Sequence, residues 1–177
     1  MDFAVNELHA GKAAGLDSLQ TEHIINSHPI LFKILSLLYN IMLAIGFVPD
    51  KFGQGLLIPI PKDSSARGIL KVSQFLGITI SPILSKVFEH CILKLFKAYL
   101  YTSDRQFGFK KKIRCNHAIF AVRKAIDYFV DNGSTVNMCC LDVASAFDRV
   151  NYRGLFLKLL DRGVPLNLIC VVKFFVL

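Results

Sequence analysis

The segment at residues 139–156, CCLDVASAFDRVNYRGLF, places a carboxylate where a charge is costly to bury. Asp142 follows a run of apolar residues that is typical of a buried strand. A divalent cation prefers hard oxygen ligands, and its charge compensates that of a half-buried carboxylate. Asp142 is therefore a candidate metal ligand.

Three ordinary roles also account for Asp142. Its carboxylate can cap a helix formed by the following VASAFDRV, pair with a nearby Lys or Arg, or lie in solvent. The residues alone leave these alternatives open. For Asp148, a local ion pair with Arg149 or Arg153 is the simpler interpretation.

The residues that follow Asp142 could border a bound anion. Ala144, Ser145 and Ala146 are small, so their backbone amides could face a phosphate. The bulky Phe147 comes next and could form a wall of the same pocket.

Basic residues gather at a second place, where Lys110, Lys111, Lys112 and Arg114 lie close together. The whole chain has a formal net charge of +8 and a pI of about 9.4. Such an excess of basic residues favours a polyanionic partner, and it favours nucleic acid over an acidic membrane surface. The alternative for the cluster is an ordinary solvated loop.

The remaining composition excludes several other classes. The five cysteines include no Cys-x-x-Cys pair, so neither a zinc site nor a disulfide framework is expected. The chain has no glycine-rich phosphate loop and no Gly-x-Ser-x-Gly elbow. Its N-terminus, MDFAVNELHAGK, lacks the apolar core of a signal peptide. We therefore expect an intracellular protein, in the nucleus or cytoplasm.

Hydrophobic spacing predicts an α+β fold. Helices are expected over 29–45, 82–100, 117–131, 152–162 and 165–176, and strands over 56–60 and 135–142. We expect the 29–45 helix to be a core helix rather than a membrane span, because its apolar run is short and interrupted by Lys33 and Asn40. Residues 63–74 are polar and predict a loop.

Three details of this prediction can be tested directly. The 82–100 helix should be capped by Ser81, with Pro82 at its first position. The 56–60 strand contains two prolines, which confine it to a sheet edge or a strand end. The 117–131 helix should be buried through four apolar side chains: Ile119, Val122, Ile126 and Phe129.

The segment around Asp142 resembles motif A of the reverse transcriptases of non-LTR retrotransposons (long interspersed elements). Four further segments resemble that family in the same order: GKAAGLDSLQTEHI (11–24), GLLIPIPKD (55–63), GITISPILSKVFEHCIL (77–93) and SDRQFGFKKKIRCNHAI (103–119). Together the five cover nearly the whole chain. The resemblance implies part of a right-hand polymerase, with a helical N-terminal part at 1–53, fingers at 54–134 and the beginning of the palm at 135–177.

The resemblance implies RNA-templated addition of dNTPs to a DNA primer. Asp142 would be the first aspartate that binds two Mg²⁺, and Lys62 a fingers lysine facing the nucleotide phosphates. Phe147 matches the aromatic residue that excludes a 2′ hydroxyl. The backbone of four residues would lie along the triphosphate: Val143, Ala144, Ser145 and Ala146.

The resemblance also places a group of residues against the RNA template and primer. These are Gln106, Gly108 and Phe109 beside the template and palm, and the basic Lys110, Lys111, Lys112 and Arg114 against a phosphate backbone.

The chain departs from the family at three points. Leu76 stands where the family has an arginine that grips the nucleotide, and Lys112 stands where it commonly has glycine. Loss of the arginine contact would lower the reaction rate by a factor on the order of 10²–10³. The 177 residues contain no Tyr-x-Asp-Asp, and the uncapped helix at Leu177 suggests a truncated chain. We expect this polypeptide to be inactive alone; a non-catalytic basic RNA-binding module is the alternative.

Overall fold

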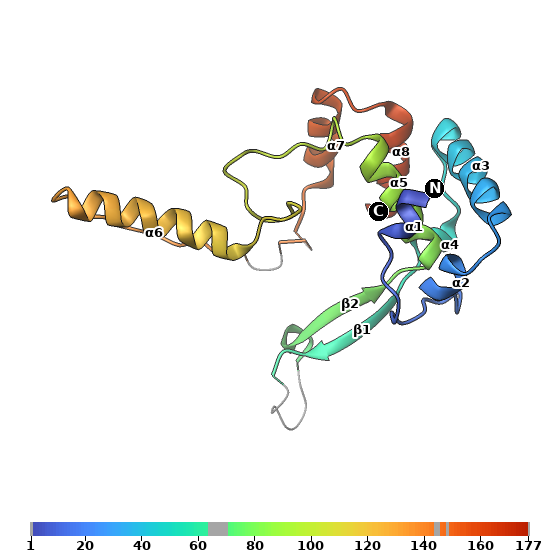
Figure 1. The fold of residues 1–177 in the computed structure, drawn as a ribbon, viewed down its shortest axis with the longest axis horizontal. Helices are drawn as coiled ribbons and strands as arrows, with labels where there is room; N and C mark the ends of the chain where they lie inside the picture. The colour runs from blue at the N-terminus through green and yellow to red at the C-terminus, as the bar shows by residue number, and fades with distance from the viewer. Residues whose placement is uncertain (1, 64–70, 144–145, 148, 177) are drawn as a thin grey trace. The chain divides into compact units, whose positions relative to one another are not determined.

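The computed structural model of the protein describes residues 2–63, 71–143, 146–147 and 149–176 (Figure 1). Ala144, Ser145 and Asp148, which the sequence singles out, lie outside the described residues. The chain forms two compact units. The larger unit comprises Met1–Tyr99 with Asn151–Leu177, and the smaller one Leu100–Val150.

Helices build most of the larger unit. They are α1 (Asp2–Asn6), α2 (Thr21–Ile25), α3 (Ile30–Ile45), α4 (Asp50–Gly53), α5 (Ile83–Leu95), α7 (Tyr152–Asp161) and α8 (Leu166–Val176). The core lies between α3, α5 and α8, where Phe88, Val87 and Val171 are fully buried. The predicted helices at 29–45, 152–162 and 165–176 are therefore confirmed within one or two residues.

Tyr39 connects α3 to α5 in this core. Its hydroxyl donates a hydrogen bond to the Leu84 carbonyl at 2.8 Å, and its ring centroid lies 4.8 Å from that of Phe88. Burial raises the pKa of Tyr39 well above the usual range of a tyrosine. The Ser85 hydroxyl bonds to the Phe52 carbonyl, which ties α4 to the same helix.

The predicted cap of α5 is wrong. Pro82, in an extended conformation with ψ of 142°, takes the N-cap position, and no side chain caps the helix. Ser81 therefore lies one residue too early for its hydroxyl to reach the first free amides. The helix also ends at Leu95, and residues 96–99 form turns rather than the predicted last helical turn.

The larger unit also carries a β-hairpin. Strands β1 (Leu56–Pro61) and β2 (Phe75–Ile80) are antiparallel, with Pro59 opposite Gly77 and Ile60 opposite Leu76. A short 3₁₀ helix, Val72–Gln74, leads into β2. The predicted strand is confirmed, and its prolines do lie on a sheet edge. Part of the predicted loop, residues 64–70, lies outside the described residues.

The smaller unit contains one long helix, α6 (Cys115–Asp131). The prediction of a helix here is confirmed, but the prediction of its burial is wrong. None of its residues is buried; Ile119 is 60% exposed and Val122 46%. An apolar stripe is buried only when another element packs on it, and no other helix or strand is described in this unit.

The strand predicted at 135–142 is also absent. In the described part of the chain, residues 135–143 belong to no strand, and all of them are exposed except the half-buried Val136. A strand needs a partner for its backbone N–H and C=O groups. The two described strands, β1 and β2, pair with each other and not with this apolar segment.

Candidate nucleotide and nucleic-acid contacts

The segment around Asp142 is exposed. Asp142 and Val143 are exposed, and Ala146 and Phe147 lie in a turn, with Phe147 73% exposed. Further along the same segment, Arg149 also lies in a turn and Val150 in no regular structure. Because neither turn is helical, the described residues give no support to helix capping by Asp142.

Phe147 contacts one aromatic side chain of the smaller unit. Its ring centroid lies 6.2 Å from that of Phe109, with the rings perpendicular at 87°. This edge-to-face geometry is favourable for aromatic pairs. The structure therefore brings together the two segments that the sequence assigns to the nucleotide sugar and to the template.

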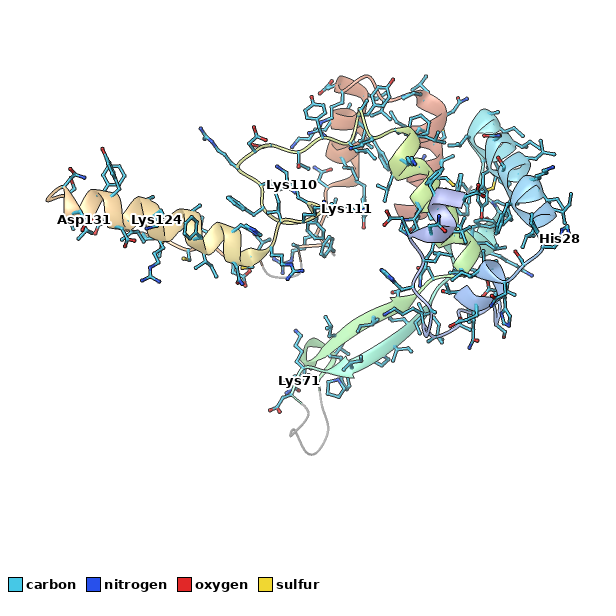
Figure 2. The ribbon with its side chains drawn as sticks, viewed as in Figure 1. His28, Lys71, Lys110, Lys111, Lys124 and Asp131 are labelled. Atoms are coloured by element: carbon cyan, nitrogen blue, oxygen red, sulfur yellow. The ribbon has the colours of Figure 1, made fainter. Side chains whose placement is uncertain are left out.

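The 103–114 loop is held by short-range hydrogen bonds. Gln106 Nε2 donates to the Gly108 carbonyl at 3.0 Å, and Lys110 Nζ donates to the Ser103 carbonyl at 2.7 Å. Part of the predicted basic surface thus stabilises the loop itself. Lys111 and Lys110 are labelled in Figure 2, where they lie on the same loop.

Two residues of this loop adopt a left-handed backbone. Phe109 has φ of 59° and Lys112 φ of 66°. Glycine adopts this region without steric cost, whereas a residue with a Cβ is strained there. Lys112 is the position where the resembled family commonly has glycine, so the backbone at 112 has the shape that glycine favours.

The start of α6 has a cap that the sequence analysis missed. The Arg114 N–H donates to Nδ1 of His117 at 3.0 Å, and the His117 N–H donates back to the Arg114 carbonyl at 3.0 Å. The same pattern starts α2, where the Gln20 N–H donates to Nδ1 of His23 at 2.9 Å. A histidine three residues after a cap position is the signal that could have located both helix starts.

Lys62 and Leu76 lie on one face of the hairpin. The Lys62 N–H donates to the Gln74 carbonyl at 2.8 Å, which continues the β1–β2 ladder by one pair. Ile60 and Leu76 are directly opposite each other, so their side chains lie on the same face of the hairpin. Lys62 is two residues after Ile60, and alternate residues of a strand share a face, so its side chain lies on that face as well. The position of the missing arginine therefore neighbours the predicted phosphate-facing lysine.

The described residues do not fit the two Mg²⁺ ions that the resemblance implies. Among them, no three His, Cys, Asp or Glu side chains gather into a group that could hold a metal ion. Asp142 alone supplies too few oxygen ligands for two divalent cations. Magnesium therefore stays a prediction.

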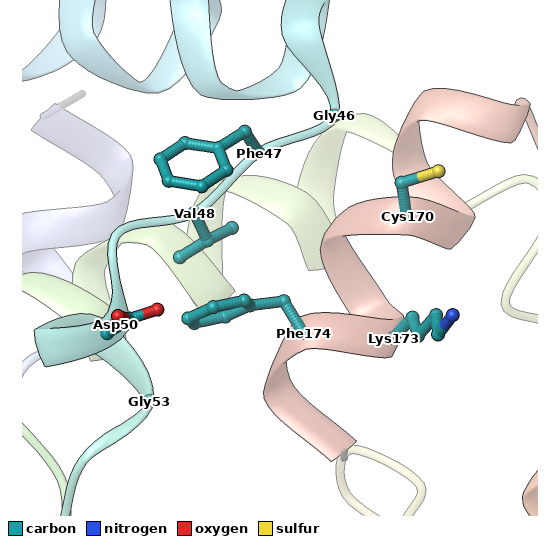
Figure 3. A pocket seen from close by; sticks show the side chains of 8 residues that line it. All are labelled: Gly46, Phe47, Val48, Asp50, Gly53, Cys170, Lys173 and Phe174. Carbon is teal, nitrogen blue, oxygen red and sulfur yellow. The ribbon is translucent and has the colours of Figure 1, made fainter.

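A cavity of about 470 Å³ lies elsewhere, between the α3–α4 connection and α8 of the larger unit (Figure 3). Gly46 has φ of 71°, and a Cβ on it would lie 3.1 Å from Cβ of Cys170. Asn167 Nδ2 of α8 donates a hydrogen bond to the Ala44 carbonyl of α3 at 2.9 Å, which also connects these two helices. None of the predicted site residues lines this cavity, which is bordered by Gly46, Phe47, Val48, Asp50, Gly53, Cys170, Lys173 and Phe174.

The membrane alternative has no support in the described residues. Within them, no helix combines the length and the apolar character that a bilayer span requires. The apolar 29–45 segment forms the 16-residue α3, which buries Leu35, Tyr39 and Met42 in the core.

Comparison with known proteins adds a second kind of observation. No protein-family model matches the chain. A probable RNA-directed DNA polymerase from transposon X-element of Drosophila melanogaster is 27% identical over 129 residues, or 71% of this chain. A second one, from transposon BS of the same organism, is 26% identical over 161 residues, or 88% of this chain. The chain is reverse-transcriptase-like.

This finding confirms the resemblance to non-LTR retrotransposon reverse transcriptases that the ordered segments indicate. The reverse-transcriptase-like chain spans only 14% and 17% of the length of these two relatives. Its mixed helix and strand content agrees with the predicted α+β class. The boundaries at 53 and 134, the fingers and palm assignments, and the roles of the site residues remain predictions.

Proposed function

We propose that the chain supplies the fingers and the first palm segment of an RNA-directed DNA polymerase that adds dNTPs to a primer on an RNA template. The observation that carries the proposal is the similarity to two transposon polymerases over 71% and 88% of the chain. The nucleic acid, the nucleotide and the reaction are taken from those relatives' names and from the sequence resemblance.

The geometry of the smaller unit supports this function. Phe109 packs edge-to-face on Phe147, so the template-side segment steadies the side chain that would exclude a 2′ hydroxyl. Residues 105–114 include five basic and no acidic side chains. Such a loop suits a phosphate backbone, and binding should weaken steeply as salt rises.

The hairpin supports a nucleotide contact in the larger unit. Lys62 would donate to the phosphates of the incoming dNTP from the face that also carries Leu76. An arginine at 76 would add a second donor on that face. Leucine has no donor, so this chain should bind the triphosphate less well than a relative with arginine.

A primer-extension assay tests the reaction. With RNA template, DNA primer, dNTPs and Mg²⁺, the 177-residue polypeptide alone should extend no primer, because it contains no Tyr-x-Asp-Asp. Extension that disappears in Asp142→Ala would contradict this expectation.

A chimera tests the family assignment. The aligned segment of the X-element polymerase is replaced by this chain, and extension is measured with and without Asp142→Ala. We expect extension that depends on Asp142. A chimera that folds but is equally active with alanine at 142 would remove Asp142 from the site.

Nucleic-acid binding is tested by fluorescence anisotropy on an RNA–DNA hybrid. Lys110→Glu, Lys111→Glu and Lys112→Glu together should weaken binding and reduce its salt dependence. A matched control reverses three exposed lysines of the larger unit: Lys33, Lys51 and Lys97. Equal losses in both triple variants would show general charge attraction rather than a loop contact.

A further inference from the structure

The two edges of the hairpin differ in their ability to pair with another strand. In an antiparallel ladder, backbone N–H and C=O groups point alternately toward the partner strand and away from it. The Lys62–Gln74 hydrogen bond shows that even-numbered residues of β1 point inward. Leu57, Pro59 and Pro61 therefore present their backbone to the outer edge.

Proline closes the outer edge of β1. Pro59 and Pro61 have no N–H, so only Leu57 could donate to an additional strand. Both prolines lie at outward positions, which is why they cost the β1–β2 ladder no hydrogen bond. An edge with a single donor out of three is a poor template for strand addition.

The outer edge of β2 is open. By the same alternation, Phe75, Gly77 and Thr79 point their backbone away from β1. Within the described residues, the N–H groups of Gly77 and Thr79 have no hydrogen-bond partner, whereas the Phe75 N–H donates to the Val72 carbonyl of the preceding 3₁₀ helix. Gly77 and Thr79 are exposed, and Figure 1 shows β2 with β1 as its one neighbouring strand.

We propose that two copies of this chain associate through β2, pairing antiparallel about a two-fold axis at Gly77. In this register Gly77 faces Gly77 of the partner copy, and Phe75 faces Thr79 of the other copy on each side. The Gly77 pair then exchanges two hydrogen bonds, and each Thr79 N–H donates to the Phe75 carbonyl of the other copy, which gives about four between the copies, because the Phe75 N–H is bonded to Val72. The four strands form one sheet with β1 at each end.

A second copy is the occupant because the edge is self-complementary. The outward positions 75, 77 and 79 are symmetric about Gly77, so the free N–H groups of Gly77 and Thr79 lie opposite the carbonyls of Gly77 and Phe75 in the other copy. The sequence of β2 is FLGITI. It contains no charged residue and no proline, which are the residues that commonly keep an edge strand from pairing with another strand. Pairing stops at two copies because the remaining edges are the proline-blocked β1 strands.

The apolar side chains favour the same arrangement. Within strands β1 and β2 the even-numbered face carries six aliphatic side chains, and all but Ile80 are at least 39% exposed: Leu56, Ile58, Ile60, Leu76, Ile78 and Ile80. In the paired sheet Leu76 faces Ile78 of the second copy, so the central side chains cover one another. This inference does not depend on the proposed polymerase function.

The first experiment measures the molar mass of the full chain by sedimentation over a wide range of concentration. We expect a discrete dimer. Thr79→Pro removes one outward N–H from the open edge of β2, and Leu57→Pro removes one from the blocked edge of β1, directly opposite. Thr79→Pro should abolish the dimer and Leu57→Pro should leave it intact. A monomer at all concentrations, or association unaffected by Thr79→Pro, would overturn the proposal.

The second experiment tests the register by cross-linking. The exposed cysteines Cys115, Cys139, Cys140 and Cys170 are first replaced by serine. Leu76→Cys and Ile78→Cys chains are then mixed and oxidised. In the proposed register these positions are directly opposite, within disulfide reach, whereas each position is diagonal to itself. Cross-linked dimer should form in the mixture and far less in either variant alone; equal yields in all three would overturn the register.

Discussion

The rings of Phe109 and Phe147 meet edge-to-face, with centroids 6.2 Å apart. The two residues are 38 positions apart in the chain, and the contact joins the 103–114 loop to the segment after Asp142. Phe109 holds its position with a left-handed backbone, φ 59°. The relationship makes Phe109 a positioning residue for Phe147.

This pair predicts a change in sugar selection. In the chimera with the X-element polymerase, Phe147→Val should raise incorporation of ribonucleotides relative to dNTPs, because the wall against the 2′ hydroxyl becomes smaller. Phe109→Ala should have a weaker effect in the same direction, since it removes the ring that steadies Phe147. Primer extension with rNTPs and dNTPs measures the ratio. Phe120→Ala on exposed α6 is the control, and a Phe109 variant with unchanged selection would contradict the positioning role.

Leu76→Arg should strengthen the nucleotide site. The substitution places a guanidinium on the hairpin face that carries Lys62, and the chimera should extend primers on the order of 10²-fold faster. Leu57→Arg is the matched control, because Leu57 is an exposed leucine of the same hairpin on its other face. Equal gains from both variants would show that added charge, rather than its position, is responsible.

Lys112→Gly should stabilise the smaller unit by about 0.5–1 kcal/mol. The left-handed backbone at 112 costs a non-glycine residue about 1–2 kcal/mol, and glycine's greater freedom in the unfolded chain offsets part of that gain. Urea unfolding followed by the helical circular dichroism of α6 measures the change. Lys112→Ala removes the same charge but keeps a Cβ, so it should show no such gain.

Tyr39→Phe should destabilise the larger unit by about 1–2 kcal/mol, because the half-buried Leu84 carbonyl loses the hydroxyl donor of Tyr39. The raised pKa of Tyr39 adds a pH dependence. The protonated phenol is favoured in the folded state, so this contribution is complete below the unfolded pKa of about 10 and is lost as the pH rises above it. Denaturant midpoints of Tyr39→Phe and of exposed Tyr128→Phe, measured at neutral and alkaline pH, test both statements.

Glu22→Gln should loosen the 7–20 segment at neutral pH. The Glu22 carboxylate accepts the Gly11 N–H at 2.6 Å, and this hydrogen bond lowers the pKa of Glu22. A lowered folded pKa contributes stability above the unfolded value of about 4, and that contribution is lost as the pH falls through the folded pKa. Hydrogen exchange of the Gly11 amide should be faster in the variant at pH 7 and should converge with the wild type in acid. Glu7→Gln is the comparison.

The sequence by itself determined the local elements and the resemblance to reverse transcriptases. Apolar spacing located α3, α6 and α8, because a helix brings every third or fourth residue to one face whatever surrounds it. Two prolines placed the β1 strand at a sheet edge, since proline cannot donate to a ladder. Five short segments in order indicated the resemblance that the two Drosophila relatives support.

Tertiary structure alone decided what these elements touch. The apolar stripe of α6 and the apolar residues 135–143 predict burial, yet burial requires a second element that is remote in sequence, and none is described there. The prediction that Ser81 caps α5 was wrong because the helix begins one residue later than the sequence pattern predicted. The hairpin register, which puts Lys62 beside Leu76 and leaves the backbone of Gly77 unpaired, depends on long-range strand pairing that no local pattern encodes.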